Sequence, residues 1–117
     1  MNFLLVFLGG GIGCVIRYLI GLGFQKTSVS LPWATFLSNI SACIIFACVL
    51  WIAQSKENNS GAQLRLLLLT GLCGGLSTFS SFGYETFLLL KQSLYVYAFL
   101  NIVLSCTVCI LIFYIFS

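Results

Sequence analysis

Four long apolar runs divide this chain, and each is long enough to cross a membrane as a helix. They cover residues 2–24, 32–53, 63–90 and 94–116. A helix rises about 1.5 Å per residue, so that about twenty residues span a hydrocarbon core about 30 Å thick. The pattern predicts an all-α integral membrane protein in which residues 1–117 form a single domain of four transmembrane helices.

The third run is too long for a straight span and is polar at its centre. At about 1.5 Å per residue, its roughly 28 residues would reach roughly 42 Å. Its middle reads GLCGGLSTFSSFGYE over residues 71–85, with adjacent glycines and several hydroxyl side chains. Irregular backbone at membrane depth is tolerated only where protein or a polar cavity surrounds it. We therefore expect this helix to break mid-membrane near Gly74 and Gly75, within the segment from Gly74 to Ser77, beside a path for an ion or a substrate.

Polar residues recur at helical spacing in three of the runs. The stripes are Thr35, Asn39 and Cys43 in the second run, Thr78, Ser81 and Glu85 in the third, and Tyr97, Asn101, Ser105 and Cys109 in the fourth, with Phe79 and Phe82 on a face beside the third stripe. Residues three or four apart share one side of a helix, and lipid offers no partner to amides and hydroxyls, so that these faces should turn inward. They either hold the helices together or line a pathway, and three stripes beside a broken helix favour the pathway.

Composition places the chain in the membrane class. Hydrophobic residues make up 61% of the 117 residues and charged residues 6%, whereas a soluble domain carries about 25% charged residues. We expect lipid around the helices and no nucleic-acid partner, because the cations are scattered. The six cysteines all fall within predicted spans. Cys106 and Cys109 have metal-site spacing, but without histidine or a second pair we interpret the cysteines as small packing residues.

The positive charges give almost no bias for orientation in the membrane. Four spans would put Lys56 and Arg65 on one side, and Lys26 and Lys91 on the other, with Arg17 leaning toward the second group. Orientation normally follows the excess of Lys and Arg in short loops. The balance favours insertion in both orientations and an antiparallel homodimer, although a weak bias is also compatible with one orientation.

The polar groups near the predicted break suit a small anion and a cation at different places. Asn39 can donate two hydrogen bonds, and Phe79 and Phe82 have electropositive ring edges. Carbonyls freed near Gly74 and Ser77 could hold a cation, while amides at the start of the second half-helix favour negative charge. Glu85 is the only acidic residue within a span, and an intramembrane acid is a functional candidate by default.

At these residues the sequence resembles the Fluc (CrcB) family of fluoride channels along its whole length. The matching motifs are Gly9-Gly10-x-x-Gly13-x-x-x-Arg17-Tyr18, Thr35-x-x-x-Asn39, Gly71-x-x-Gly74-Gly75-x-Ser77-Thr78-Phe79-Ser80-Ser81-Phe82-x-x-Glu85 and Asn101-x-x-x-Ser105. The third-helix signature is the most specific of these. Ser77 and Ser81 stand where the family often has Thr.

The resemblance implies a channel rather than an enzyme, which exports fluoride passively across the cell (plasma or inner) membrane and so gives fluoride resistance. It implies a dual-topology antiparallel homodimer with two pores and a central structural Na⁺ at the dimer interface. Phe79 and Phe82 would line the pore and Asn39 would donate to fluoride. The remaining polar positions of the pathway would be Thr35, Thr78, Ser81, Ser105, Glu85, Asn101 and, near the aqueous vestibule, Arg17. Backbone carbonyls of Gly74 and Ser77 from both subunits would hold the Na⁺.

Three rival functions fit a protein of this size. A small dual-topology multidrug-type transporter needs an acidic residue in the first span, where the only ionisable side chain is Arg17. A fluoride–proton antiporter would have Glu85 as its only plausible carrier. A structural subunit would use the glycine-rich faces for packing, but it leaves the alignment of Phe79, Phe82 and Asn39 unexplained.

Overall fold

The computed structural model describes residues 1–26, 31–54 and 59–117, which form four helical spans. Three of them are continuous helices: α1 (Asn2–Gly23), α2 (Trp33–Ala53) and α6 (Tyr95–Phe116). The third span, Ser60–Lys91, is interrupted, and all four are long and apolar enough to cross a membrane. The prediction of four spans is confirmed, with each boundary within a few residues. Lys56, which entered the charge balance, lies outside the described residues.

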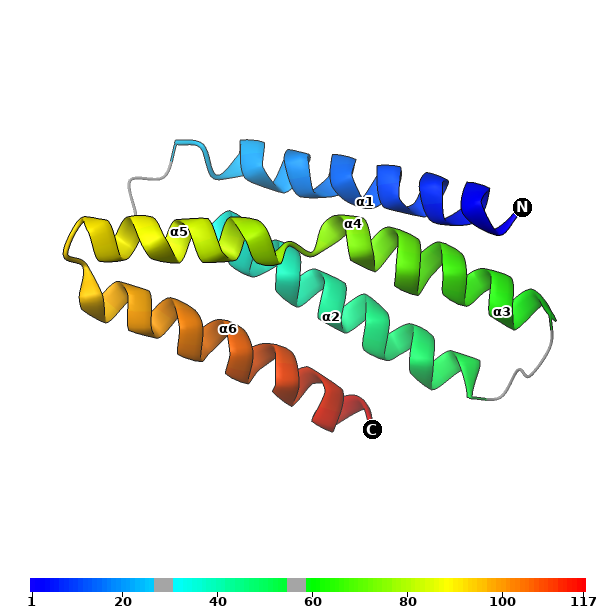
Figure 1. The fold of residues 1–117 in the computed structure, drawn as a ribbon. Helices are drawn as coiled ribbons and strands as arrows, with labels where there is room; N and C mark the ends of the chain where they lie inside the picture. Colours follow the sequence, from blue (N-terminus) through cyan, green and yellow to red (C-terminus); the bar gives the residue numbers. More distant parts are fainter. Residues whose placement is uncertain (27–30, 55–58) are drawn as a thin grey trace.

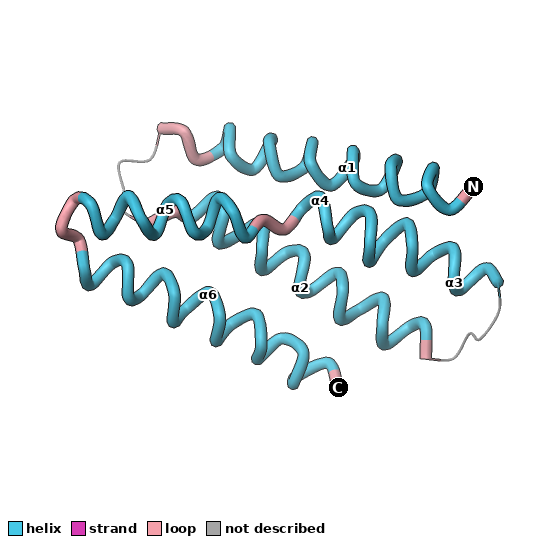
Figure 2. The backbone as a smooth tube through the Cα atoms, viewed as in Figure 1, coloured by secondary structure: helices cyan, strands magenta, loops and turns pink. Residues whose placement is uncertain are grey.

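The third span consists of several pieces in line. It begins with α3 (Asn59–Arg65), continues through a π-helical segment η1 (Leu66–Cys73) and the short α4 (Gly74–Leu76), and resumes as α5 (Phe79–Lys91). The break lies between α4 and α5, where Ser77 and Thr78 are extended (Figure 2). The predicted break is therefore correct at Ser77 but wrong at Gly74 and Gly75, which belong to the helix α4.

The glycines instead allow α1 to pack directly on the first half of the third span. A Cβ atom added to Gly9 would lie 2.9 Å from the backbone nitrogen of Leu72, and one added to Gly71 would lie 2.9 Å from Cα of Gly9. A Cβ at Gly75 would overlap the carbonyl oxygen of Gly10. Small residues four apart on both helices permit this close backbone approach, as is common in membrane helix pairs.

The remaining helices form a layer around the break. In Figure 1, α1 lies along one side of the third span, and α6 lies on the other side, where it packs against α2 and α5. A small core of Ala42, Cys73 and Leu76 joins α2 to the third span. Arg65 Nη2 donates to the carbonyl of Ala53 at 3.2 Å, which ties the start of the third span to the end of α2. Both chain termini point toward one end of the bundle, as an even number of spans requires.

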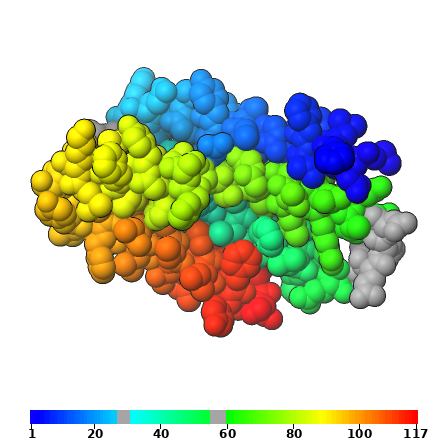
Figure 3. Space-filling view, in the orientation of Figure 1, coloured from blue at the N-terminus to red at the C-terminus, as the bar shows by residue number. Residues whose placement is uncertain are grey.

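Much of the outer surface is apolar. Phe3, Phe7 and Tyr114 are each at least three-quarters exposed, on α1 and α6. The space-filling view shows side chains of α1, α5 and α6 covering one face, with α2 visible between them (Figure 3). Such a surface is compatible with a hydrocarbon surrounding and not with water.

Candidate functional site

The break in the third span is stabilised by the amide side chain of Asn39 on α2. The backbone N–H of Thr78 donates to Asn39 Oδ1 at 2.7 Å, and Asn39 Nδ2 donates to the Thr78 carbonyl at 3.3 Å. In hydrocarbon the Thr78 N–H would otherwise be unsatisfied, at a large cost in free energy. The Thr78 carbonyl, which directly precedes α5, also accepts the first hydrogen bond of that helix. Asn39 therefore determines where the helix can break, and one of its two amide hydrogens remains unused by this pair.

Two further side chains donate to carbonyls at the end of the first half of the span, where the Cys73 carbonyl also accepts the backbone N–H of Ser77. Arg17 Nε donates to the Gly75 carbonyl at 3.0 Å, and Ser77 Oγ donates to the Cys73 carbonyl at 2.7 Å. Arg17 thus places its positive charge at a helix C-terminus, where cations are favoured. It also lines an open cavity of about 470 Å³ on α1 together with Tyr18 and Gln25. The family resemblance implies that Arg17 lies near an aqueous vestibule, and this role stays a prediction.

The carbonyls of Gly74 and Ser77 have no hydrogen-bond donor among the described residues. The Thr78 N–H, which would continue the helix by donating to Gly74, is taken by Asn39. Gly74 is exposed on the surface of the bundle, and no atom lies within 4 Å of the position that its Cβ would occupy. Carbonyl oxygens of this kind are the ligands that hard cations prefer. The break therefore leaves two carbonyl oxygens without donors among the described residues, and their chemistry is of the kind that binds Na⁺.

The second half of the span begins with a capped N-terminus. Thr78 is the N-cap of α5, and its Oγ1 accepts a hydrogen bond from the backbone N–H of Ser81 at 3.3 Å. Thr and Ser at this position typically stabilise a helix by about 1 kcal/mol. The N-terminus of α5, with its partial positive charge, therefore lies at the break. Ser81 acts here through its backbone, in the first turn of α5.

An open groove runs beside the break, with a volume of about 290 Å³. Its walls come from α2, the break, α5 and α6, and the lining residues are Asn39, Cys43, Ser77, Thr78, Phe79, Phe82, Ser105, Cys106 and Cys109. None of them is charged. The rings of Phe79 and Phe82 lie 5.8 Å apart between centroids, and Phe79 is 84% exposed. Five residues predicted from sequence for the pathway thus meet here: Asn39, Thr78, Phe79, Phe82 and Ser105.

Thr35 and Glu85 form a separate pair outside the groove. Thr35 Oγ1 donates to Glu85 Oε1 at 2.7 Å, which joins the polar stripes of α2 and α5 as expected. The other carboxyl oxygen, Oε2, is buried and has no hydrogen-bond partner among the described residues. The Thr35 hydroxyl is therefore the one hydrogen-bond donor to this carboxyl group among the described residues.

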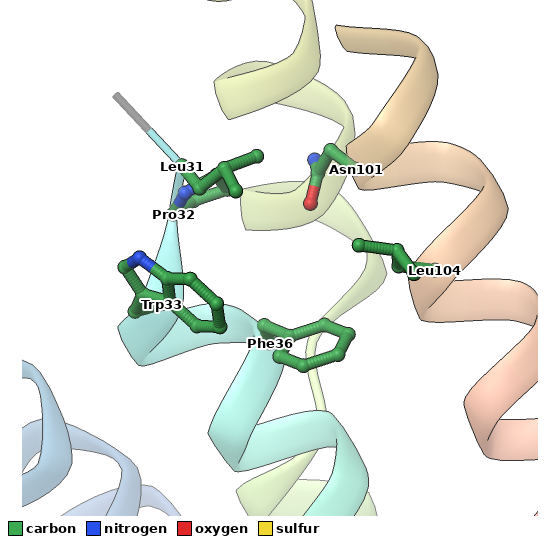
Figure 4. Close-up of a pocket in the computed structure, with 6 residues that line it drawn as sticks. All are labelled: Leu31, Pro32, Trp33, Phe36, Asn101 and Leu104. Carbon is green, nitrogen blue, oxygen red and sulfur yellow. The ribbon is translucent and has the colours of Figure 1, made fainter. Parts of the chain in front are cut away.

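Asn101 also lies outside the groove, in a buried polar chain between α6 and α5. Its Nδ2 donates to Thr86 Oγ1 at 2.9 Å, and Thr86 Oγ1 in turn donates to the Phe82 carbonyl at 2.8 Å. Ser105 Oγ makes a longer contact, 3.5 Å, with Asn101 Oδ1. Figure 4 shows the Asn101 amide among Leu31, Phe36 and Leu104 in a small pocket of about 10 Å³.

Thr86 is a site residue that the sequence reasoning missed. It is buried and links the amide of Asn101 to the backbone of Phe82. The sequence contained a signal for it, because Thr86 follows Phe82 by four residues and therefore lies on the same face of the helix as Phe79 and Phe82. Tyr97, in contrast, belongs to the predicted stripe of α6 but is 39% exposed and does not turn inward.

Comparisons with known proteins identify similar chains over most of this length. The family described as CrcB-like protein, Camphor Resistance (CrcB), matches residues 4–116. A fluoride-specific ion channel FluC from Phocaeicola vulgatus is 41% identical over 95 residues, which cover 80% of this chain and 77% of the relative. Another FluC, from Shewanella frigidimarina, is 38% identical over 114 residues, which cover 97% of this chain and 90% of the relative. A third, from Gloeothece citriformis, is 42% identical over 103 residues, covering 85% and 80% respectively.

Proposed function

This chain belongs to the CrcB-like family of multi-pass cell-membrane proteins, and on that premise we propose that it is a fluoride-selective channel. It is not an enzyme. The observation that carries the proposal is the uncharged groove in which Asn39, Thr78, Phe79, Phe82 and Ser105 come together beside a helix break. Relatives that cover most of the chain are named fluoride-specific ion channels, which supports fluoride as the ion.

The groove has the chemistry that a small, strongly hydrated anion needs. A channel must replace the water contacts that the ion loses on entry. Asn39 keeps one amide hydrogen beyond its bond to Thr78, Ser105 contributes a hydroxyl, and Phe79 and Phe82 offer electropositive ring edges. The N-terminus of α5 adds about half a positive charge at the same place. The absence of a charged group from the groove lining keeps binding weak enough for the ion to leave.

A second copy of the chain would complete the pathway. Phe79 is 84% exposed on the single chain, and the groove is open along one side. An antiparallel partner would cover this side and create two equivalent pores, one for each copy. The near balance of Lys and Arg between the two ends supports insertion in both orientations. The remaining exposed apolar side chains would contact lipid.

A Na⁺ ion would hold the two copies together at the break. The carbonyls of Gly74 and Ser77, which lack donors among the described residues, would supply its ligands from both copies. The ion would act as a structural cross-link that compensates the partial negative charge at the C-terminus of α4. Serine in place of threonine at position 77 makes no difference to a backbone ligand.

Fluoride export would be passive. Fluoride enters acidified cells as neutral HF, which dissociates in the more alkaline cytoplasm and leaves the anion trapped. A channel then releases it down its electrochemical gradient. Glu85 lies outside the groove and is held by Thr35, which favours a channel over a proton-coupled antiporter. The multidrug-type transporter is disfavoured because the first span carries no acidic residue.

The function is tested by ion efflux from liposomes that contain the purified protein. We expect rapid fluoride loss after addition of a K⁺ ionophore, with chloride retained in the same vesicles. Fluoride loss that needs no K⁺ shunt and is accompanied by proton movement would favour the antiporter. Vesicles that lose no fluoride under either condition would refute the proposal.

Dual insertion is tested separately with reporters fused to the C-terminus. A fluorescent reporter that matures only in the cytoplasm and an enzyme reporter that is active only outside it should both give signal. Activity on one side alone would contradict an antiparallel dimer, while leaving the fluoride efflux assay unaffected.

A further inference from the structure

Three cysteine thiols line the same groove as the phenylalanine pair. Cys43 comes from α2, and Cys106 and Cys109 come from α6. From the sequence, all six cysteines were interpreted as packing residues. The groove shows that half of them meet at one place, on two helices, beside Phe79 and Phe82.

Two of these cysteines lie on neighbouring helices that pack against each other. Cys43 lines the groove from α2 and Cys109 lines it from α6, and Cys106 precedes Cys109 by three residues on α6. Cys43 and Cys109 are half-buried, Cys106 is exposed, and all three are free thiols. The other cysteines lie elsewhere: Cys14 is exposed on α1, Cys73 is in the core, and Cys48 does not line the groove.

We propose that Cys43 and Cys109 form a two-coordinate binding site for a soft, thiophilic cation such as Hg²⁺, Ag⁺ or Cu⁺, and that the bound cation obstructs the groove. Soft cations select thiolate ligands. No group of three His, Cys, Asp or Glu residues among those described is arranged around a common metal position. A linear two-sulfur complex needs no third ligand, and Cys106 stands beside it at the open edge of the groove. Binding of Hg²⁺ would form two metal–sulfur bonds and release two protons from the thiols.

The obstruction follows from the position of the pair. The thiols share the groove with Phe79 and Phe82, so a bound metal and its positive charge would occupy space beside the proposed anion path. This part of the inference rests on the proposed function, because it concerns fluoride movement. The binding itself does not, since it depends only on the two thiols and can be measured on the protein in detergent.

Binding is tested with one equivalent of Hg²⁺ per chain, supplied as the nitrate without chloride, followed by washing with an excess of a monothiol. A monothiol removes mercury that is held by one cysteine. Two sulfurs on one chain raise the affinity for mercury by about 10²–10⁴-fold, because the second bond forms at a high effective concentration. We expect the unmodified protein and the control variant Cys14→Ser/Cys48→Ser to retain about one mercury per chain by intact mass. Cys106 must be removed together with each ligand, because it is the third thiol of the groove. Cys43→Ser/Cys106→Ser and Cys109→Ser/Cys106→Ser should each lose the mercury, whereas Cys106→Ser alone should retain it. Equal retention by Cys43→Ser/Cys106→Ser and the control would overturn the site.

Obstruction is tested in the same preparations after reconstitution into liposomes. After the monothiol wash, fluoride efflux should fall at least about tenfold in the unmodified protein and in the control variant. Mercury treatment should leave efflux unchanged in Cys43→Ser/Cys106→Ser, in which Cys109 is the one thiol left among the residues that line the groove. Full efflux from protein that still carries mercury would overturn the obstruction. Efflux that is absent before mercury is added would refute the proposed function, and the retention measurement would still decide the site.

Discussion

Replacement of Gly13 by alanine should separate α1 from the third span, whereas replacement of Gly11 should not. A Cβ atom at Gly13 would overlap the carbonyl oxygen of Leu72 and would lie 2.7 Å from the backbone nitrogen of Leu76. Nothing lies within 4 Å of the corresponding position at Gly11, two residues away on the same helix. The two substitutions add the same methyl group to the same element, so that they differ only in what the methyl group meets.

The magnitude follows from the atoms involved. Both contacts at Gly13 are with backbone, which no side-chain rotation can relieve, so α1 must move outward by about 1 Å to reach an ordinary contact distance. Overpacking of this kind costs about 1–3 kcal/mol. A gain of about 1 kcal/mol in helix propensity offsets part of it. The gain applies equally to Gly11→Ala, for which it should be the only effect.

The assay is the midpoint temperature at which the detergent-solubilised protein loses its monodisperse peak in size-exclusion chromatography. A net loss of about 1 kcal/mol corresponds to a decrease of roughly 3–6 °C for a chain of this size. Gly11→Ala should melt at the same temperature as the unmodified protein or slightly higher. Equal midpoints for Gly13→Ala and Gly11→Ala would refute the close crossing of α1 over η1 and α4.

Three further predictions concern the break and its neighbours. Thr35→Val should lower the same melting temperature, because it removes the hydroxyl that donates to Glu85. Loss of this donor to a partly buried carboxyl group costs about 1–3 kcal/mol. Thr35→Ser keeps the hydroxyl, and an equal decrease in melting temperature for both variants would contradict this role. Asn39→Asp should depress fluoride efflux strongly while leaving the dimer assembled, because a carboxylate cannot donate to the Thr78 carbonyl and adds negative charge to the groove; normal efflux would mean that Asn39 is misassigned. Exchange of Na⁺ for a large organic cation during purification should weaken the dimer in cross-linking assays, and an unchanged cross-linked fraction would argue against an ion at Gly74 and Ser77.

The apolar runs were sufficient to predict the spans, because burial in hydrocarbon requires uninterrupted helices of a fixed length. The inward turn of the polar stripes followed for the same reason. It is confirmed by the bonds from Thr35 to Glu85 and from Asn39 to Thr78. These features depend on the local pattern of apolar and polar residues and on the membrane that surrounds the helices. Both can be inferred from the sequence itself.

The position of the break could not be predicted, because it depends on a partner distant in sequence. Gly74 and Gly75 look like helix breakers, but Gly75 is needed for contact with α1 and both remain helical. The break falls instead where Asn39 can accept a hydrogen bond from the Thr78 N–H, which has no place in the helix. The bond from Arg17 to the Gly75 carbonyl and the position of Cys43 and Cys109 in one groove likewise depend on how the helices cross.

The most direct test of the central claim is the rate of fluoride efflux from liposomes for Phe82→Ile compared with Phe7→Ile. Phe82 lines the groove, whereas Phe7 is 75% exposed on the outer face of α1, away from it. If fluoride passes through the groove, Phe82→Ile should lose most of its fluoride efflux while Phe7→Ile retains the rate of the unmodified protein. Equal rates for the two variants, with both proteins dimeric and fully reconstituted, would contradict a fluoride path along Phe82.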